Sequence, residues 1–211
     1  MVMVASINGS PHMRSRTQHL LTELCTVLGE NIAIEIYQID LCAMARDIFN
    51  GPQRADITMR GEAILRQAEE ADILIVGTPV YRASYTGLLK QFFDLLSDKA
   101  MAGKIAIPVA SGETAMHGLM LEHQMRPLLG SLGMRTTSQT LFGTELEISA
   151  AGVLSRRLRD DARRIAFEAV QMFLLHTCMA LESFSISGKR QVAGTGIEFD
   201  AIRGRSRTIR S

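Results

Sequence analysis

The sequence predicts an α/β protein built on a doubly wound parallel sheet of five strands, in the order 2-1-3-4-5. Short apolar runs rich in β-branched residues alternate with longer segments of helical periodicity through most of the chain. Several of these runs are apolar on both faces, which is typical of strands that helices cover on both sides. The chain shows no internal repeat that would favour another architecture.

The strands and helices can be assigned in order along the chain. The expected strands are "VMVASIN", "IAIEIYQI", "ILIVGTPV", "KIAIPVA" and "TTSQTLF". The expected helices lie near residues 15–29, 57–70, 84–97, 116–132 and 151–181. In the third helix, apolar residues recur at helical spacing, at Leu89, Phe92, Phe93 and Leu96. Five strands joined in this way predict the flavodoxin-like form of the doubly wound sheet.

Composition limits the class of protein. The 211 residues are 46% hydrophobic and 21% charged, which suits a globular domain with a full core. No apolar stretch approaches the roughly 20 residues of a membrane helix, and the N-terminus lacks the pattern of a secretion signal. We therefore expect a cytoplasmic protein that does not bind membranes. Cys25, Cys42 and Cys178 are scattered, so neither a disulfide framework nor a metal site is predicted.

Charge is unevenly distributed, although the whole chain carries a net charge of only +1. Residues 183–211 hold six basic and two acidic residues among glycines and serines. We expect one flavodoxin-like domain over residues 1–182 and a basic, flexible tail over residues 183–211. Because this short tail lacks interleaved aromatic residues, it does not predict binding to nucleic acid.

A doubly wound sheet binds its ligands outside the carboxyl ends of its strands, where the strand order reverses. The loops expected at that edge are residues 8–17, 77–86 and 110–117. The third loop offers Ser111, Gly112 and Thr114, whose backbone can approach the edge of a heterocycle. An ordinary turn between strand and helix is the alternative for this loop.

The first loop lies within "INGSPHMRSRTQHLL". Gly9 permits a tight turn, and the start of the next helix then carries Ser10, Arg14, Ser15 and Thr17. Hydroxyls, a guanidinium and the free N–H groups of a helix start all suit a phosphate. The loop matches neither the GK[ST] ending nor GxGxxG. A capping box formed by Ser15 and Gln18 is the alternative, and it requires no ligand.

The second loop, "GTPVYRASYTG", is apolar and aromatic where a buried strand should end in a polar turn. Pro79, Val80 and Tyr81 predict a surface for a flat ring, and the proline fixes the local backbone. The alternative, in which an aromatic residue packs under the following helix, fits Tyr85 better than Tyr81. A site for a phosphate, an aromatic surface and a polar turn are thus expected at one edge of the sheet.

Three segments carry a family resemblance: "GSPHMRSRT", "GTPVYRASYTGLLKQFFDLL" and "AMHGLMLEHQMRPLLGSLG". Over residues 2 to about 145, the chain resembles the NAD(P)H-dependent FMN reductases of two-component sulfonate monooxygenase systems. The resemblance implies that the first loop contacts the FMN phosphate and that the second lies beside the isoalloxazine. It also implies that residues 111–114 meet the pyrimidine edge. His12 and Glu113 depart from the family pattern, and Glu113 brings an acidic side chain near the flavin.

The implied reaction is the reduction of FMN by NADH or NADPH, after which reduced FMN serves a partner monooxygenase. Hydride transfer between stacked rings needs no acid or base, and the sequence has no GxSxG or HExxH motif, so no catalytic residue is assigned. A quinone, azo or chromate reductase that keeps its FMN is one alternative. A flavodoxin-type electron carrier is another, but such carriers are usually strongly acidic.

The fourth expected helix contains Pro127, which cannot donate to the carbonyl of His123 four residues earlier. A kink or π-bulge is therefore expected there. We also expect a homodimer or homotetramer built on helices 84–97 and 116–132, with His123 more plausible at the interface than in catalysis. The basis is a nearly all-round apolar surface on the fourth helix, made by Met116, Leu119, Met120, Leu121, Met125, Leu128 and Leu129.

Overall fold

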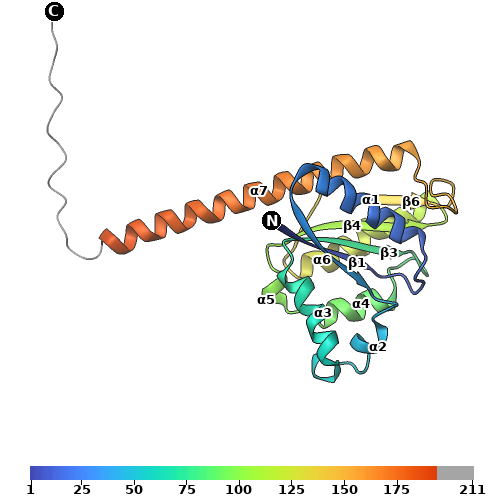
Figure 1. Ribbon diagram of the computed structural model, residues 1–211, viewed down its shortest axis with the longest axis horizontal. Coiled ribbons are helices and arrows are strands. Elements are labelled where there is room, and N and C mark those ends of the chain that lie inside the picture. Colours follow the sequence, from blue (N-terminus) through green and yellow to red (C-terminus); the bar gives the residue numbers. More distant parts are fainter. Residues whose placement is uncertain (194–211) are drawn as a thin grey trace, which may run out of the picture. The chain divides into compact units, whose positions relative to one another are not determined.

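The computed structural model describes the backbone of residues 1–193 and the side chains of residues 1–179. A parallel sheet in the order β2-β1-β3-β4-β5 forms its centre (Figure 1). This order confirms the predicted flavodoxin-like, doubly wound α/β fold. The strands are β1 (Val2–Asn8), β2 (Ile34–Asp40), β3 (Ile73–Pro79), β4 (Ile105–Gly112), β5 (Arg135–Thr136) and β6 (Leu141–Thr144).

The fifth expected strand is two strands, which corrects the number of strands from five to six. Both β5 and β6 pair with β4 in parallel, so the predicted position in the sheet holds. At the interruption, Pro108 of β4 has no N–H to donate to the next strand, and the Arg126 guanidinium instead bonds the carbonyl oxygens of Thr137 and Ser138 at 2.8 and 3.3 Å. The carbonyl groups of these two residues therefore point to a side chain, which interrupts the ladder.

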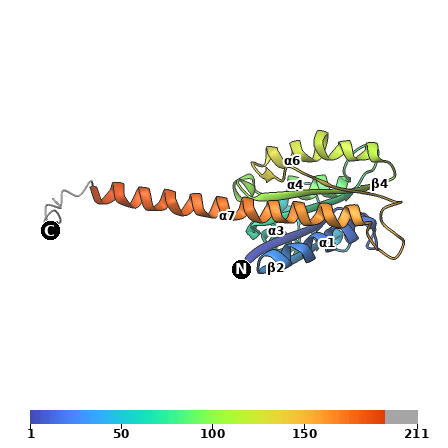
Figure 2. The same cartoon turned by 90° about the horizontal axis from the view of Figure 1, so that it is seen from above.

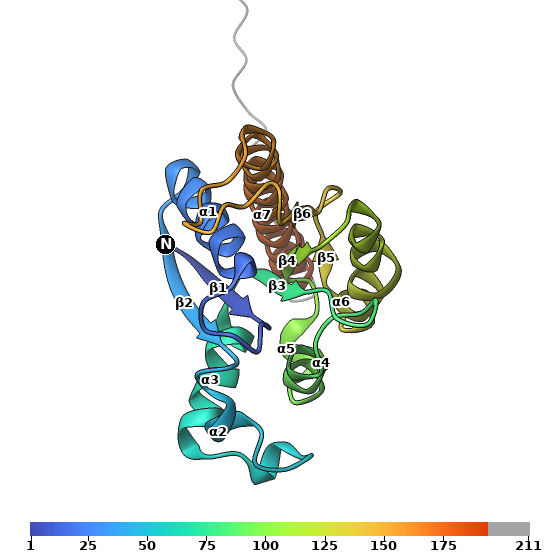
Figure 3. The same ribbon diagram turned by 90° about the vertical axis from the view of Figure 1, so that its right-hand side faces the viewer.

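Helices cover both faces of the sheet. Figure 3 shows α1 (Arg16–Asn31) on one face and α3 (Met59–Glu70), α4 (Gly87–Asp94) and α6 (Arg126–Ser131) on the other. Figure 2 looks down on the face that α1 and the first turns of α7 (Arg156–Ala193) cover. Shorter turns complete the order: α2 (Ala45–Ile48), η1 (Arg54–Asp56), α5 (Asp98–Met101), η2 (Ala115–Gly118) and η3 (Leu121–Met125).

Successive side chains along a strand pack alternately into two hydrophobic cores, one on each face of the sheet. Along β3, Ile73 and Ile75 join the core under α1, whereas Leu74 and Val76 join the core under α3 and α4. All four side chains are fully buried. The strand is apolar throughout because both of its faces are covered, as the sequence predicts.

The last helix, α7 (Arg156–Ala193), starts later and runs further than the expected helix at 151–181. The chain divides into two units, Met1–Phe173 and Leu174–Ser211. In the first unit, α7 packs into the α1 core through Leu158, Ala162, Ile165 and Ala169. The second unit continues as helix to Ala193.

The expected boundary between residues 182 and 183 lies within α7. The rest of the expected tail, residues 194–211, lies outside the described residues, so its flexibility stays a prediction. No helix in the described part of the chain is long and apolar enough to cross a membrane.

The expected distortion near Pro127 is confirmed, because η3 is a π-helix. The all-round apolar surface predicted for this region is wrong in part. Met120, Leu121, Met125 and Leu129 are buried in the chain's own core, and Leu128 packs against it. Met116 and Leu119 remain exposed, because they lie on η2 and just after it.

Candidate functional site

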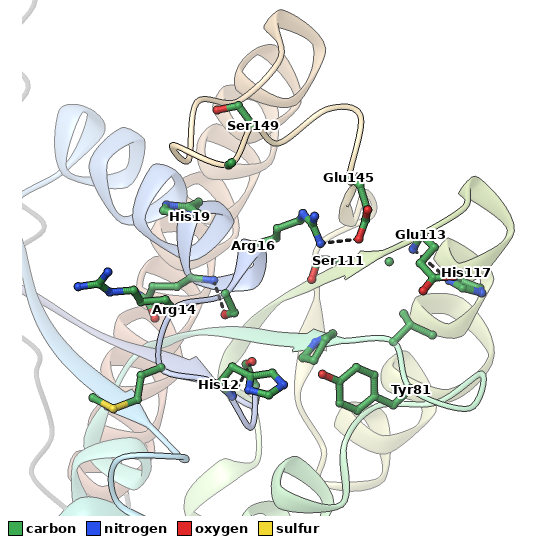
Figure 4. A pocket seen from close by; sticks show the side chains of 18 of the residues that line it. His12, Arg14, Arg16, His19, Tyr81, Ser111, Glu113, His117, Glu145 and Ser149 are labelled. Carbon is green, nitrogen blue, oxygen red and sulfur yellow. Dashed lines mark hydrogen bonds and ion pairs between the residues drawn. The ribbon is translucent and has the colours of Figure 1, made fainter.

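A pocket of about 1160 Å³ lies at the carboxyl edge of the sheet (Figure 4). The strands end in register there, since Asn8 pairs with Gly77, Pro79 with Ser111, and Ser111 with Gly143. The loops that follow these strands therefore meet around one cavity. Its lining includes nine predicted site residues: Ser10, Arg14, Ser15, Pro79, Val80, Tyr81, Ser111, Gly112 and Glu113. Thr17 and Thr114 do not line it.

Asn8 shapes the first loop at the end of β1. Its Oδ1 accepts from the Ser10 backbone N–H at 3.1 Å, and its Nδ2 donates to Gln18 Oε1 at 3.0 Å. Ser10 Oγ in turn accepts from the His12 backbone N–H at 3.1 Å. Because this hydroxyl acts as an acceptor in the loop, its own hydrogen is available to a ligand.

Ser15 begins α1 as its N-cap. Its backbone is extended, and its Oγ accepts from the Gln18 backbone N–H at 3.3 Å. The N-cap half of the expected capping box is therefore confirmed for Ser15. The Gln18 side chain bonds to Asn8, so the reciprocal half of a capping box is not formed. The N–H groups at the start of a helix have no partners within it and favour an anion.

Thr17 lies behind the pocket wall. Its side chain is fully buried, and its Oγ1 shares a hydrogen bond of 2.8 Å with Ser111 Oγ. This bond joins the first turn of α1 to the end of β4. The hydroxyl of Thr17 therefore connects the first and third loops within the protein.

The second loop is fixed on both sides. The Val80 backbone N–H donates to the carbonyl oxygen of Ser111 at 2.8 Å, and Thr86 Oγ1 donates to the carbonyl oxygen of Gly9 at 2.6 Å. Tyr81 is 45% exposed and its side chain lies along the pocket in Figure 4. Tyr85, in contrast, packs against the core of the α3 and α4 face. Tyr81 is thus the aromatic residue of this loop that a ligand can reach.

The third loop also brings His117 to the pocket, a residue that was not among those predicted from the sequence. His117 Nδ1 accepts from the Glu113 backbone N–H at 3.3 Å (Figure 4). A Cβ on Gly112 would come within 2.9 Å of the His117 side chain, so only glycine fits this close approach. Glu113 and Thr114 are exposed.

A fourth loop, which follows β6, also lines the pocket. Glu145 forms an ion pair of 2.6 Å with Arg16, and Ser149 of the same loop lines the pocket as well (Figure 4). The three loops expected from the sequence do not include this one. The rule that placed those three at the carboxyl edge also applies to the loop after the fifth strand, so it could have found Glu145.

The first loop gives its end of the pocket a positive charge. Arg14, Arg16 and Arg82 line the cavity together with Glu113 and Glu145. Arg16 is paired with Glu145, whereas Arg14 forms no ion pair or hydrogen bond with the residues that the structure describes. An unpaired guanidinium, two hydroxyls and a helix start together suit a phosphate group.

Comparisons with known proteins agree with this chemistry. A family model described as NADPH-dependent FMN reductase matches residues 2–146. The chain is 34% identical to the NADH-dependent FMN reductase SfnE of Pseudomonas putida, over 82% of this chain and 93% of that protein. It is 32% identical to an FMN reductase (NADPH) of Pseudomonas aeruginosa, over 81% and 91%. The crystal structure of the NADH:FMN oxidoreductase EMOB, in its apo form, aligns with a TM-score of 0.66 and 29% identity, over 82% and 89%.

Proposed function

The chain belongs to the NADPH-dependent FMN reductase family, and we propose that FMN binds in the pocket at the carboxyl edge of its sheet. The protein is an NAD(P)H-dependent oxidoreductase that reduces FMN. The observation that carries the proposal is the meeting of a phosphate-type site and an aromatic surface in one cavity. In this proposal, residues 111–113 contact the pyrimidine edge of the flavin.

The phosphate of FMN contacts Ser10, Arg14 and Ser15 in this proposal. Both serine oxygens already accept a backbone N–H, so their hydroxyl hydrogens can point to phosphate oxygens. Arg14 adds a charge that no described residue neutralises. Thr17 supports this site from behind through its bond to Ser111 and does not touch the phosphate.

The isoalloxazine ring lies against Pro79, Val80 and Tyr81, which we call the ring surface. Single ligands usually occupy pockets of about 300–1,000 Å³, and the volume of about 1160 Å³ leaves space for a nicotinamide beside the flavin. FMN supplies the ring nitrogen that takes up a hydride from NADH or NADPH. The chain orients the two rings and needs no proton-transferring side chain for this step.

Replacement of Arg14 tests the proposed site. Arg14→Ala should weaken FMN binding roughly tenfold to a hundredfold, because it removes a charged hydrogen bond to the phosphate. Riboflavin lacks that phosphate and should lose much less affinity. Both dissociation constants can be measured by titration of flavin fluorescence. Arg135→Ala is the matched control, since Arg135 pairs with the opposite end of β4. Equal losses for FMN and riboflavin would contradict the assignment.

Reduced FMN leaves the enzyme for a partner monooxygenase in this proposal, and the reaction takes place in the cytoplasm. The resemblance to the reductases of sulfonate monooxygenase systems supports such a partner, and the exposure of Tyr81 supports an accessible ring. Kinetics with FMN as the varied substrate test the release. Saturation by free FMN, together with loss of flavin on dialysis, is the expected result. A flavin retained through dialysis would favour a quinone, azo or chromate reductase.

We propose a homodimer or homotetramer as the active assembly. Support for this assembly comes from Met116 and Leu119, which are exposed beside the pocket-lining His117. These two apolar side chains would be covered by a second copy of the chain.

A further inference from the structure

The turn after Tyr81 has an unusual backbone. Arg82 and Ala83 have φ values of 51° and 61°, and within the described residues no other non-glycine residue has a positive φ. Tyr81 and Ser84 exchange two backbone hydrogen bonds of 2.9 Å, which defines a two-residue hairpin of type I′. Such turns favour asparagine and glycine, because a residue with a Cβ is strained at positive φ. An Arg-Ala turn therefore needs support from its surroundings.

Gln124 supplies that support from another element. Its Nε2 donates to the carbonyl oxygen of Ala83 at 2.6 Å, and its Oε1 accepts from the Ser84 hydroxyl. Both halves of the amide are therefore used, and both bonds end on the second half of the turn. Gln124 is half-buried and does not line the pocket.

The π-helix η3 holds Gln124 in place. Leu121 and Met125 at its two ends are fully buried in the core of the α3 and α4 face. Pro127 cannot donate to the carbonyl oxygen of His123, which accounts for the wider turn at this point. Gln124 thus lies on a π-helical turn whose two ends are buried in the core, and its side-chain amide contacts the strained hairpin.

We infer that Gln124 is a positioning residue for the flavin: it holds the Arg82–Ala83 turn in its left-handed conformation and thereby keeps Val80 and Tyr81 at the pocket. Val80 is fixed on its other side by its bond to Ser111, so Tyr81, where the turn begins, is the part of the ring surface whose position depends on the turn. This inference rests on the proposed placement of FMN against Pro79, Val80 and Tyr81. It predicts that the loss of Gln124 relaxes the turn and weakens flavin binding.

A double-mutant cycle tests the inference. Gln124→Met keeps a side chain of similar size without either hydrogen bond and should raise the FMN dissociation constant roughly threefold to tenfold. Ala83→Gly removes the strain at positive φ. In the Ala83→Gly background, Gln124→Met should therefore cost less affinity than in the wild-type background. Flavin fluorescence titration measures binding, and thermal unfolding reports stability separately.

Gln91→Met is the matched control. Gln91 is also half-buried and its Nε2 also donates to a backbone carbonyl, that of Gly51 at 3.2 Å, but it contacts neither the turn nor the pocket. Its replacement should lower the unfolding temperature and leave the FMN dissociation constant unchanged. If Gln124→Met does not fold, Gln124→Glu serves in the same cycle, because it keeps the acceptor for Ser84 but sets a charged oxygen against the carbonyl oxygen of Ala83 in place of the donor.

The outcomes separate the inference from the proposed site. Equal losses of FMN affinity with and without Ala83→Gly, or no loss in a folded Gln124 variant, would overturn the role of Gln124. Tyr81→Ala should weaken FMN binding if the flavin lies on the ring surface. If Tyr81→Ala weakens binding and Gln124→Met does not, only the role of Gln124 is rejected. If Tyr81→Ala has no effect on binding, the placement of FMN itself is wrong.

Discussion

Hydroxyl side chains near the start of α1 divide into two kinds by their surroundings. Ser10 and Ser15 line the pocket, whereas the Thr17 hydroxyl is fully buried against Ser111. A sequence motif groups all three as phosphate contacts, because each carries an oxygen near a helix start. The direction of its side chain separates Thr17 from the two serines. That direction depends on how α1 is rotated about its axis relative to the sheet, and a sequence motif carries no information on this rotation.

Thr17→Val should act on stability and leave phosphate recognition unchanged. Valine has the same shape, but it leaves the buried Ser111 hydroxyl without its partner, which should cost roughly 1–3 kcal/mol. The ratio of FMN to riboflavin affinity should stay near that of the wild type. Chemical denaturation and the two flavin titrations check this prediction. A fall in the ratio as large as that of Arg14→Ala would instead make Thr17 a phosphate ligand.

The strained turn at Arg82 and Ala83 was not predictable from local sequence. Type I′ turns are recognised by Asn-Gly or similar pairs, and "RA" carries no such signal. The turn depends on Gln124, which lies about forty residues further along the chain. Such long-range support of a disfavoured backbone is expected mainly at functional sites.

At the level of elements, strands covered on both faces were the easiest to predict. The apolar run of β3 indicates a buried strand, because side chains on both of its faces enter a hydrophobic core. The fifth strand was harder, since its "TTSQ" segment is polar and its carbonyl groups bond to Arg126. Local β-propensity indicates an extended chain there. It does not indicate which backbone hydrogen bonds between neighbouring strands are replaced by bonds to a side chain.

A cluster of ion pairs joins the elements on the α3 side. Arg54 of η1 bonds Glu62 at 2.8 and 2.9 Å and Glu69 at 3.0 Å, and Glu69 also accepts from the Ser97 backbone N–H at 2.9 Å. The hydrogen bonds from Arg54 lower the pKa of Glu62 to about 2. Burial opposes the shift at Glu69, but the bonds from Arg54 and Ser97 outweigh it and lower the Glu69 pKa as well. These carboxylates therefore stabilise the fold in their charged form.

Removal of one carboxylate should have a pH-dependent effect. Because the pKa of Glu62 is lower in the folded state, its contribution is complete above its ordinary value of 4.5 and disappears as the pH falls towards 2. Glu62→Gln should therefore cost about 1 kcal/mol at pH 7, and the difference from wild type should shrink between pH 4.5 and 2. Urea unfolding at a series of pH values measures it, with Glu70→Gln on the exposed face of α3 as control. A difference independent of pH would exclude this ionic origin.

At the level of the whole molecule, the fold reduces the apolar surface available for assembly. Most apolar residues of the segment 116–132 serve the chain's own core, so the expectation of an all-round exposed helix does not hold. The residues that remain are Met116, which is 70% exposed, and Leu119, which is 48% exposed. His123 is exposed on the adjoining π-helix. The proposed interface is therefore narrower than the sequence predicts.

The proposed oligomer should depend on this narrower surface. Leu119→Glu would place a charge in a buried contact, so it should shift the assembly to monomers at micromolar concentration. Leu146→Glu is the matched control, because Leu146 is 98% exposed in the loop after β6 and lies outside this surface. Light scattering compares the masses, and flavin titration shows whether the dissociated form still binds FMN. A wild-type protein that is an active monomer would contradict the assembly. Full assembly of Leu119→Glu would place the contact elsewhere on the molecule.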